Sequence, residues 1–249
     1  MADSLGFRLR LGIIAPSTNT SVQPEMDDMR PYGVTNHFGR LYIPDEPIHD
    51  DDGFARLMDN IRASMDEAAR VVMTCQPDRL VLGMSSETFW DGMDGSRKLM
   101  ERMRAIAGGK PVTMGSDAVI EALRCYGDIR RIAVVTPYQP LGDTQVRRFF
   151  EDAGFEIVAL EGLKCTSPVQ IAHVSQRELR DAINRVNGPS VEAIVQVGTN
   201  LAAAQVAGMA EFWLDKPVIA INTAIYWHAL RDSGIHDKVP GFGSLLLNH

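Results

Sequence analysis

Two stretches of the chain share one pattern: Lys110-Pro-Val-Thr-Met-Gly-Ser-Asp-Ala-Val119 and Lys216-Pro-Val-Ile-Ala-Ile-Asn-Thr-Ala-Ile225. Two more pairs precede them in the same order. Gly12-Ile-Ile-Ala-Pro16 matches Ala133-Val-Val-Thr-Pro137, and Leu80-Val-Leu-Gly-Met-Ser-Ser86 matches Ala193-Ile-Val-Gln-Val-Gly-Thr199. The offsets of 121, 113 and 106 residues drift as loops of unequal length would make them drift. The pattern therefore predicts two copies of one unit.

Each copy is predicted to be built from βα units. Short apolar runs alternate with stretches of helical periodicity, which is typical of a parallel sheet. The expected strands are 11–16, 41–44, 79–85, 111–115, 131–137, 156–160, 193–199 and 217–222. Eight strands could also close into a barrel. The repeat favours two similar four-stranded, flavodoxin-like α/β halves that are related by a pseudo-twofold axis.

The repeat also suggests where the halves divide. We expect residues 1–116 together with 224–249 to form the first half, and residues 117–223 to form the second. In this arrangement the helix near 224–232 crosses back and packs on the first half.

Composition excludes several classes of protein. The 249 residues include 25 Lys and Arg against 32 Asp and Glu, a net charge of −7, with 45% hydrophobic residues. This is a globular composition, and a negative balance without basic runs argues against nucleic-acid binding. No apolar run reaches the roughly 18 residues of a membrane span, and no signal peptide is recognisable. We expect a cytoplasmic protein, with a homo-oligomer left open.

Metal and cofactor sites are not expected. The six histidines form no cluster with metal-ligand spacing, and no glycine-rich fingerprint follows the first strand. The three cysteines, Cys75, Cys125 and Cys165, are odd in number and widely spaced, which favours reduced thiols.

Polar turns follow several of the predicted strands. The carboxyl ends of parallel strands carry the functional loops of open α/β sheets, and two facing halves would bring these ends into one cleft. The cleft is then expected to contain Ser17–Thr20, Ser85–Thr88, Ser116, Tyr138, Gly198–Asn200 and Asn222–Thr223.

These turns allow both structural and functional interpretations. The turn Pro16-Ser-Thr-Asn-Thr20 can cap a helix or bind an anion at its N-terminus. Ser85 and Ser86, with their backbone amides, could surround an oxyanion. Tyr138 could add a third donor, or it could be a buried tyrosine with a satisfied hydroxyl.

The same motifs resemble the aspartate/glutamate racemase superfamily, in the branch that contains maleate cis-trans isomerase and arylmalonate decarboxylase. The resemblance spans nearly the whole chain and includes Pro16-Ser-Thr-Asn-Thr20, Thr136-Pro-Tyr138 and Pro240-Gly-Phe-Gly-Ser-Leu-Leu246. It implies two α/β halves about a pseudo-dyad and a small carboxylate substrate.

The resemblance also implies roles for individual residues. Asn19 would contact a substrate carboxylate, and the further substrate-binding residues would be Ser17, Thr199, Asn200 and Thr223. The oxyanion of an enediolate would be held by Ser85, Ser86, Gly198 and Tyr138.

The chain departs from the family at its cysteines. Racemases and maleate isomerases of this family use two facing cysteines, and the decarboxylase keeps the second. The matching positions here carry Met84 and Val197, neither of which can transfer a proton. Cys165 is the one cysteine near a family substrate loop, and a reactive thiol there would need an electropositive partner.

A cofactor-independent enzyme acting on a small carboxylate metabolite through an oxyanion is therefore the leading interpretation. Without the cysteine pair, decarboxylation or hydrolysis is favoured over racemisation. Glu87 could then act as the acid or base, or water could supply the proton, although a carboxylate at a helix start is as often a capping charge. The alternative is a family member that binds a small acid without converting it.

Overall fold

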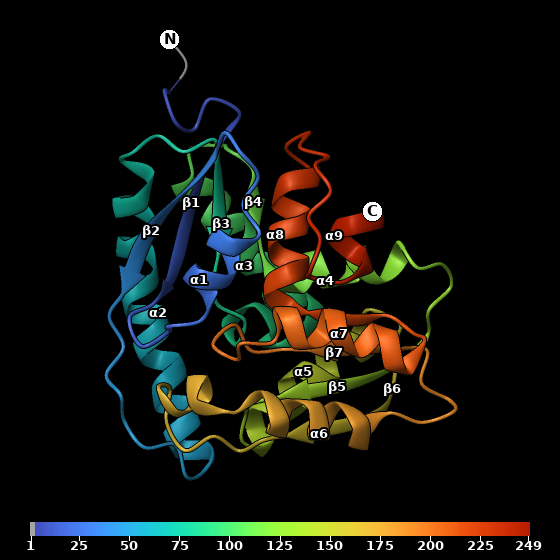
Figure 1. Ribbon diagram of the computed structural model, residues 1–249. Helices are drawn as coiled ribbons and strands as arrows, with labels where there is room; N and C mark the ends of the chain where they lie inside the picture. The colour runs from blue at the N-terminus through green and yellow to red at the C-terminus, as the bar shows by residue number, and fades with distance from the viewer. Residues whose placement is uncertain (1–2) are drawn as a thin grey trace.

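The computed structural model describes residues 3–249, which form two four-stranded sheets with all strands parallel (Figure 1). The first sheet has the order β2-β1-β3-β4, with bounds Val34–Leu41, Leu9–Pro16, Arg79–Leu82 and Val112–Thr113. The second has the order β6-β5-β7-β8, with bounds Glu156–Gly162, Arg131–Thr136, Ala193–Gln196 and Val218–Ala220. The expected fold class is confirmed, and the strands do not close into a barrel.

Helices cover the faces of both sheets. The longer helices are α2 (Asp51–Met73), α3 (Gly92–Ile106), α4 (Gly115–Arg124), α5 (Pro140–Asp152), α6 (Gln176–Val186), α7 (Ala204–Leu214) and α8 (Ile221–Arg231). Two short ones, α1 (Val22–Asp28) and α9 (Ser244–Asn248), complete the chain. Helix α2 packs on β1 and β2, and α7 packs on β8. Among residues 3–249, no helix is both long and apolar enough to cross a membrane.

The expected strand at 41–44 is wrong, because β2 ends at Leu41 instead of beginning there. The β2 sequence, Val-Thr-Asn-His-Phe-Gly-Arg-Leu, contains several polar residues and a glycine. This strand lies at the edge of its sheet and pairs with β1 alone, so much of it is only partly buried. An edge strand of this kind lacks the apolar run by which the buried strands were recognised.

Helix α8 connects the two sheets. It begins directly after β8 of the second sheet and packs against α4, β3 and β4 of the first (Figure 1). Just beyond its end, Asp232 pairs with the guanidinium of Arg79, whose side chain is almost fully buried. This packing supports the proposed division in which residues 224–249 complete the first half.

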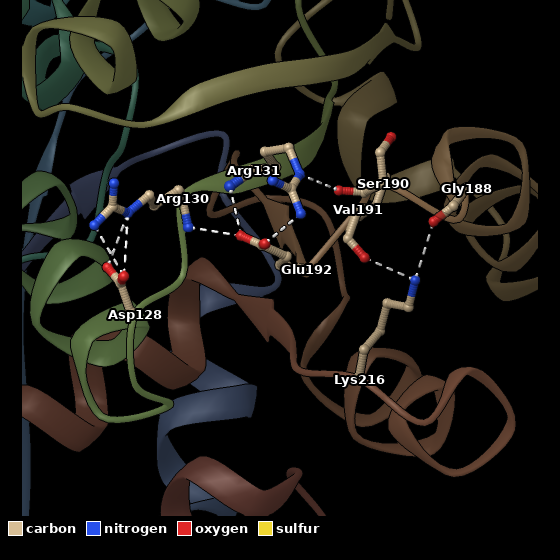
Figure 2. Close-up of polar contacts among 8 residues, drawn as sticks. All are labelled: Asp128, Arg130, Arg131, Gly188, Ser190, Val191, Glu192 and Lys216. Atoms are coloured by element: carbon tan, nitrogen blue, oxygen red, sulfur yellow. Dashed lines mark hydrogen bonds and ion pairs between the residues drawn. The ribbon is translucent and has the colours of Figure 1, made fainter.

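The lysine of the repeat, Lys110 or Lys216, makes equivalent hydrogen bonds in each half. The ammonium group of Lys216 donates to the carbonyls of Gly188 at 3.2 Å and Val191 at 2.9 Å, in the loop that enters β7 (Figure 2). Lys110 donates to the carbonyl of Pro77 in the loop that enters β3. Each lysine therefore fixes the entry to the third strand of its sheet.

A carboxylate beside each lysine is repeated as well. Glu192 accepts from the backbone amide of Arg131 at 2.8 Å and pairs with its guanidinium at 2.6 Å (Figure 2). Asp78 accepts from the backbone amide of Arg10 at 2.8 Å and pairs with its guanidinium at 3.0 Å. The internal repeat in the sequence thus corresponds to the same lysine and carboxylate contacts at the amino end of each sheet.

Strand register corrects one detail of the repeat. Ile14 of β1 is the partner of Leu82 in β3, and the equivalent Val135 of β5 is the partner of Gln196 in β7. Leu82 therefore corresponds to Gln196, an offset of 114 residues instead of the expected 113. The counterpart of Met84 is consequently Gly198, and the expected match with Val197 was wrong by one residue.

Candidate active site

One pocket lies between the carboxyl ends of the two sheets and is lined from both halves. We call it the central pocket, and its lining consists of Pro16, Thr18, Asn19, Ile43, Leu57, Ile61, Met84, Ser85, Ser86, Pro137, Tyr138, Pro168, Ile171, Gly198, Thr199 and Asn200. Seven of the ten candidate residues from the sequence line it: Asn19, Ser85, Ser86, Tyr138, Gly198, Thr199 and Asn200. Met84 lines the pocket and Val197 does not, as the corrected register requires.

Ser85 is at the centre of a polar cluster built from three strand ends. Its hydroxyl lies 2.8 Å from the hydroxyl of Tyr138, which follows β5. It also accepts a hydrogen bond from the backbone amide of Thr199, which follows β7, at 3.2 Å. All three residues are buried. Two hydroxyls and a backbone amide therefore meet at one point of the pocket wall.

Tyr138 is placed to act as a hydrogen-bond donor. Its ring packs edge-on against Phe54 of α2, with the ring centroids 5.4 Å apart. Burial raises the pKa of Tyr138 above its ordinary value, and the hydrogen bond with Ser85 only partly opposes this effect. The phenol therefore keeps its proton at neutral pH and can donate it in a hydrogen bond.

Gly198 contributes backbone and no side chain. Its φ of +113° lies in the left-handed region, and a Cβ atom there would be 2.5 Å from Cδ of Pro137. Only glycine fits this position without strain. Within residues 3–249, the Gly198 amide has no hydrogen-bond acceptor. It is an available donor in the lining of the central pocket.

Asn19 binds the amides at the start of helix α1 and also has a donor left for an anion, which are the two roles considered for its turn. Its Oδ1 accepts from the backbone amides of Ser21 and Val22, each at 3.0 Å, and so satisfies the start of α1. Its Nδ2 donates one hydrogen to Oγ1 of Thr199 at 3.0 Å. An amide nitrogen carries two hydrogens, so one remains for a ligand in the pocket.

Asn200 joins the two halves beside the pocket. Its Oδ1 accepts from the backbone amide of Thr20 at 2.9 Å, and its Nδ2 donates to the carbonyl of Pro168 at 2.9 Å. The hydroxyl of Ser21 donates to the Asn200 carbonyl, also at 2.9 Å. The Asn200 amide is thus used to position the loops around the pocket.

The structure does not bring Glu87 to the central pocket. Its carboxylate accepts from Nε of Arg62 at 2.9 and 3.0 Å, in a separate depression that also includes Trp90. Arg62 in turn lies 5.1 Å from the ring centroid of Trp90. Burial raises the pKa of Glu87, and the hydrogen bond from Arg62 opposes this effect. These contacts make Glu87 part of the packing between α2 and the turn at 87–89.

Three other polar residues expected in the cleft also lie outside the pocket lining. The hydroxyl of Ser17 accepts from the backbone amide of Ile43 at 3.0 Å. It thereby holds the backbone of Ile43, which lines the pocket. Ser116 is hydrogen-bonded to Ser96 at 2.8 Å. Thr223 is buried at the start of α8.

Thr20, Thr88 and Asn222, which were also expected in the cleft, are not among the lining residues either. The expected segments at 116 and 222–223 therefore contribute no residue to the pocket lining.

No cysteine is among the residues of 3–249 that line the central pocket. Cys75 is exposed beyond the end of α2, and Cys125 caps the end of α4. Cys165 is partly buried, and burial raises its pKa to about 11. That thiol is therefore protonated at neutral pH, in contrast to the depressed pKa of a nucleophilic cysteine.

Apolar side chains make up much of the rest of the pocket lining. They include those of Ile43, Leu57, Ile61, Met84 and Ile171, and none of the residues of 3–249 that line the pocket is charged. Leu57 and Ile61 lie one turn apart on α2. Sequence analysis missed them because such a spacing is that of any buried helix face. Across residues 3–249, no group of three or more His, Cys, Asp or Glu could hold a metal ion.

Comparison with known proteins shows that this chain is similar to enzymes. The arylmalonate decarboxylase family model matches residues 11–246. A maleate isomerase of Nocardia farcinica is 25% identical over 251 residues, covering 97% of this chain and 96% of the relative. A maleate isomerase of Geobacillus stearothermophilus is 20% identical over 249 residues, covering 95% of this chain and 96% of the relative.

Solved structures of similar proteins share the fold. The maleate isomerase of Pseudomonas putida S16 aligns with a TM-score of 0.86 at 23% identity, over 96% of this chain and 98% of that one. Arylmalonate decarboxylase aligns with a TM-score of 0.76 at 24% identity, over 95% and 98%. A Nocardia farcinica maleate cis-trans isomerase variant with a covalently bound succinylcysteine intermediate aligns with a TM-score of 0.85 at 21% identity, over 97% and 99%.

Proposed function

This chain belongs to the arylmalonate decarboxylase family, and we propose that it is a cofactor-independent enzyme that acts on a small carboxylate metabolite through an enediolate oxyanion. The observation that carries the proposal is the meeting of Ser85, Tyr138 and the Thr199 amide at one point of the central pocket. Preorganised donors of this kind stabilise negative charge that develops on oxygen. The unpaired amide of Gly198 adds a further donor.

The substrate carboxylate is assigned to the turn after β1. Asn19 has one amide hydrogen left after its bonds to Thr199 and the start of α1. Ser86 lines the same pocket and offers a second hydroxyl. Together they can orient a carboxylate beside the oxyanion donors without a charged partner.

The residues of the pocket favour decarboxylation over racemisation. No cysteine lines the pocket within residues 3–249, and the thioether of Met84 has no S–H proton to transfer. A cysteine adduct such as the succinylcysteine of the Nocardia farcinica enzyme cannot form here from the residues that line the pocket.

Decarboxylation uses the groups of this pocket and a proton from water. A carboxylate against the wall of Ile43, Leu57 and Ile61 loses hydration, which favours its departure as CO₂. The C–C bond to that carboxylate breaks, and its electron pair passes into the remaining carboxyl group as an enediolate. The donors at Ser85, Tyr138 and Gly198 hold the new oxyanion, and water then supplies a proton to carbon.

The test is conversion of a panel of acids and esters in D₂O, monitored by proton NMR. The panel contains malonates with one alkyl or aryl substituent, maleate, and simple carboxylic esters. We expect loss of CO₂ from a substituted malonate, with deuterium incorporated at the α-carbon. Formation of fumarate from maleate would instead identify an isomerase, and release of an alcohol from an ester would identify a hydrolase. If these acids raise the thermal stability of the protein but none is converted, the proposal of an enzyme is wrong, and a protein that binds small acids without converting them is favoured.

Two variants test the assigned donors. Ser85→Ala and Tyr138→Phe should each lower kcat by about 10²–10³-fold, the usual effect of removing one oxyanion donor. Tyr42→Phe is the matched control, because Tyr42 is 72% exposed and is not in the pocket lining. Equal turnover in Tyr138→Phe and the control would remove Tyr138 from the proposal.

A further inference from the structure

A largely buried carboxylate lies between the two halves and is not used in the proposed reaction. Glu25 of α1 accepts from the backbone amide of Ala204, at the start of α7, at 2.9 Å. It also accepts from Nδ2 of Asn222, at the start of α8, at 2.6 Å. Burial raises the pKa of Glu25 to about 7, although these two hydrogen bonds lower it. Both protonation states are therefore populated at neutral pH.

A short path of hydrogen bonds connects this carboxylate to the pocket. Nδ2 of Asn222 donates its second hydrogen to the carbonyl of Thr199 at 2.9 Å. The amide of Thr199 in turn donates to the hydroxyl of Ser85. One side chain, Asn222, therefore contacts both Glu25 and the residue that binds the centre of the polar cluster.

Asn222 has an unused acceptor. The residue is 1% exposed, and its Oδ1 has no hydrogen-bond partner within residues 3–249. Leaving a buried acceptor unpaired costs about 1–3 kcal/mol. Protonated Glu25 has the opposite requirement, because its new O–H needs an acceptor where Nδ2 of Asn222 now donates.

A rotation of the Asn222 amide by half a turn would pair its free Oδ1 with the O–H of neutral Glu25, and would take the two Nδ2 hydrogens away from Glu25 and from the Thr199 carbonyl. The Ala204 amide would still donate to the other carboxyl oxygen. The same rotation turns Oδ1 towards the Thr199 carbonyl, which loses its donor. The ionised and neutral forms of Glu25 thus favour opposite orientations of one buried amide.

We infer that Glu25 is a positioning residue whose proton selects the orientation of the Asn222 amide and thereby sets how Thr199 is held against Ser85. The inference rests on the proposed function, because it assigns the regulation of the same pocket. Activity is expected to rise as Glu25 loses its proton, since the ionised form holds the Thr199 carbonyl.

The charged groups around Glu25 come from α1 itself and from β2, which packs on it. Strand β2 carries His37 and Arg40, and the Arg40 guanidinium donates to Gln23 of α1. Asp28, one turn later on α1, is the charged group whose field adds to the effect of burial.

The facing ends of α7 and α8 present Ala203, Ala204 and Asn222, which are neutral. Within residues 3–249, the groups that donate hydrogen bonds to the Glu25 carboxylate are themselves neutral.

The first test needs no substrate. In a ¹H–¹⁵N NMR titration from pH 5 to 9, the Thr199 amide should shift with a midpoint near the pKa of about 7 of Glu25. The shift should be absent in Glu25→Gln and retained in Asp28→Asn, the control on the same helix. In Asn222→Ala the Glu25 carboxyl should still titrate while the Thr199 amide no longer follows. A Thr199 amide that follows the Glu25 titration in Asn222→Ala would overturn the inference.

The second test uses the substrate found by the panel. Wild-type kcat should rise with pH through this midpoint, and the rise should be absent in Glu25→Gln and in Asn222→Ala. A merely structural role would lower kcat equally at all pH values. If no acid is converted, the proposed function fails by itself, and the substrate-free titration still decides the role of Glu25. A Glu25→Gln profile identical to wild type would contradict the inference.

Discussion

Gly198 is the residue at which backbone conformation and pocket chemistry depend on each other. Its φ is +113°, and a Cβ atom would lie 2.5 and 2.6 Å from two atoms of the Pro137 ring. Gly198→Ala should therefore combine the backbone cost of about 1–2 kcal/mol with an overpacking cost of about 1–3 kcal/mol. We expect urea denaturation to show the sum, and turnover to fall because the free amide moves.

The control for this variant is Gly127→Ala. Gly127 has a φ of +96°, and a Cβ atom added there would meet nothing within 4 Å, so only the backbone cost of about 1–2 kcal/mol applies. Equal losses of stability in the two variants would show that the Pro137 ring does not limit residue 198.

Glu87 should contribute to stability and little to turnover. Its carboxylate is held by Arg62, which is itself about one-third exposed, so the pair is partly screened by solvent. We expect Glu87→Gln to lower the free energy of unfolding by about 1 kcal/mol and to keep the wild-type kcat. Asp59→Asn is the control, because Asp59 lies 3.8 Å from the same arginine and is highly exposed. If Glu87→Gln lowers turnover without lowering stability, Glu87 acts in catalysis and this prediction is wrong.

At the scale of elements, three consecutive aspartates, Asp50 to Asp52, stand at the start of α2. Asp50 is its N-cap and accepts from the amide of Gly53 at 2.8 Å. Asp50→Ala should cost about 1 kcal/mol in the free energy of unfolding, the usual value for a lost cap. Asp52→Ala removes the same charge from the first turn without a capping bond, so it should cost only a few tenths of that. Equal midpoints of urea denaturation would argue against the capping role.

Most elements could be predicted because the buried strands have the apolar runs that parallel sheets require. Strand β2 could not, since Val34–Leu41 lies at a sheet edge and alternates polar and apolar residues imperfectly. The repeat was found, but its offset at the third strand was wrong by one residue. Only the pairing of Ile14 with Leu82 and of Val135 with Gln196 determines it.

The site was predictable to the level of turns. The strand-end rule brought Asn19, Ser85, Tyr138 and Gly198 to one pocket from four separate segments. It did not give the direction of each side chain, which depends on distant partners such as Arg62 for Glu87. Glu25 and Asn222 are 197 positions apart, and no local pattern indicates their contact.

The whole molecule is two similar halves that share buried polar groups where they meet. Asn19 contacts Thr199, Ser21 contacts Asn200, and Glu25 contacts Asn222. Each contact joins the turn after β1, or the helix α1 that follows it, to a segment of the second half. Because these groups are satisfied only when the halves meet, the pocket and the interface between the halves should form together.

Stability of the whole molecule should fall as pH rises towards neutrality. Burial raises the pKa of Glu25 from its ordinary 4.5 to about 7 and that of Asp143 from 3.8 to about 6. Between these values the folded chain holds protons that the unfolded chain has released, so the free energy of unfolding decreases with increasing pH. A tenfold change in proton affinity corresponds to about 1.4 kcal/mol, so the two groups together can account for roughly a few kcal/mol.

Urea denaturation at pH 5, 6, 7 and 8 measures this decrease, which should end once Glu25 is fully ionised above its pKa of about 7. Glu25→Gln combined with Asp143→Asn should reduce this slope, because both buried protons are then absent from the equilibrium. The smaller effects of Glu87 and Asp117, whose pKa values burial raises, and of His228, whose pKa burial lowers, remain in this double variant.

Asp28→Asn, on the helix that carries Glu25, should keep most of the wild-type slope, because burial, the main cause of the raised pKa of Glu25, is unchanged. A wild-type stability that rises from pH 5 to 8 would mean that these carboxylates are ionised in the folded chain throughout, and that Glu25 holds no proton with which to act on Asn222.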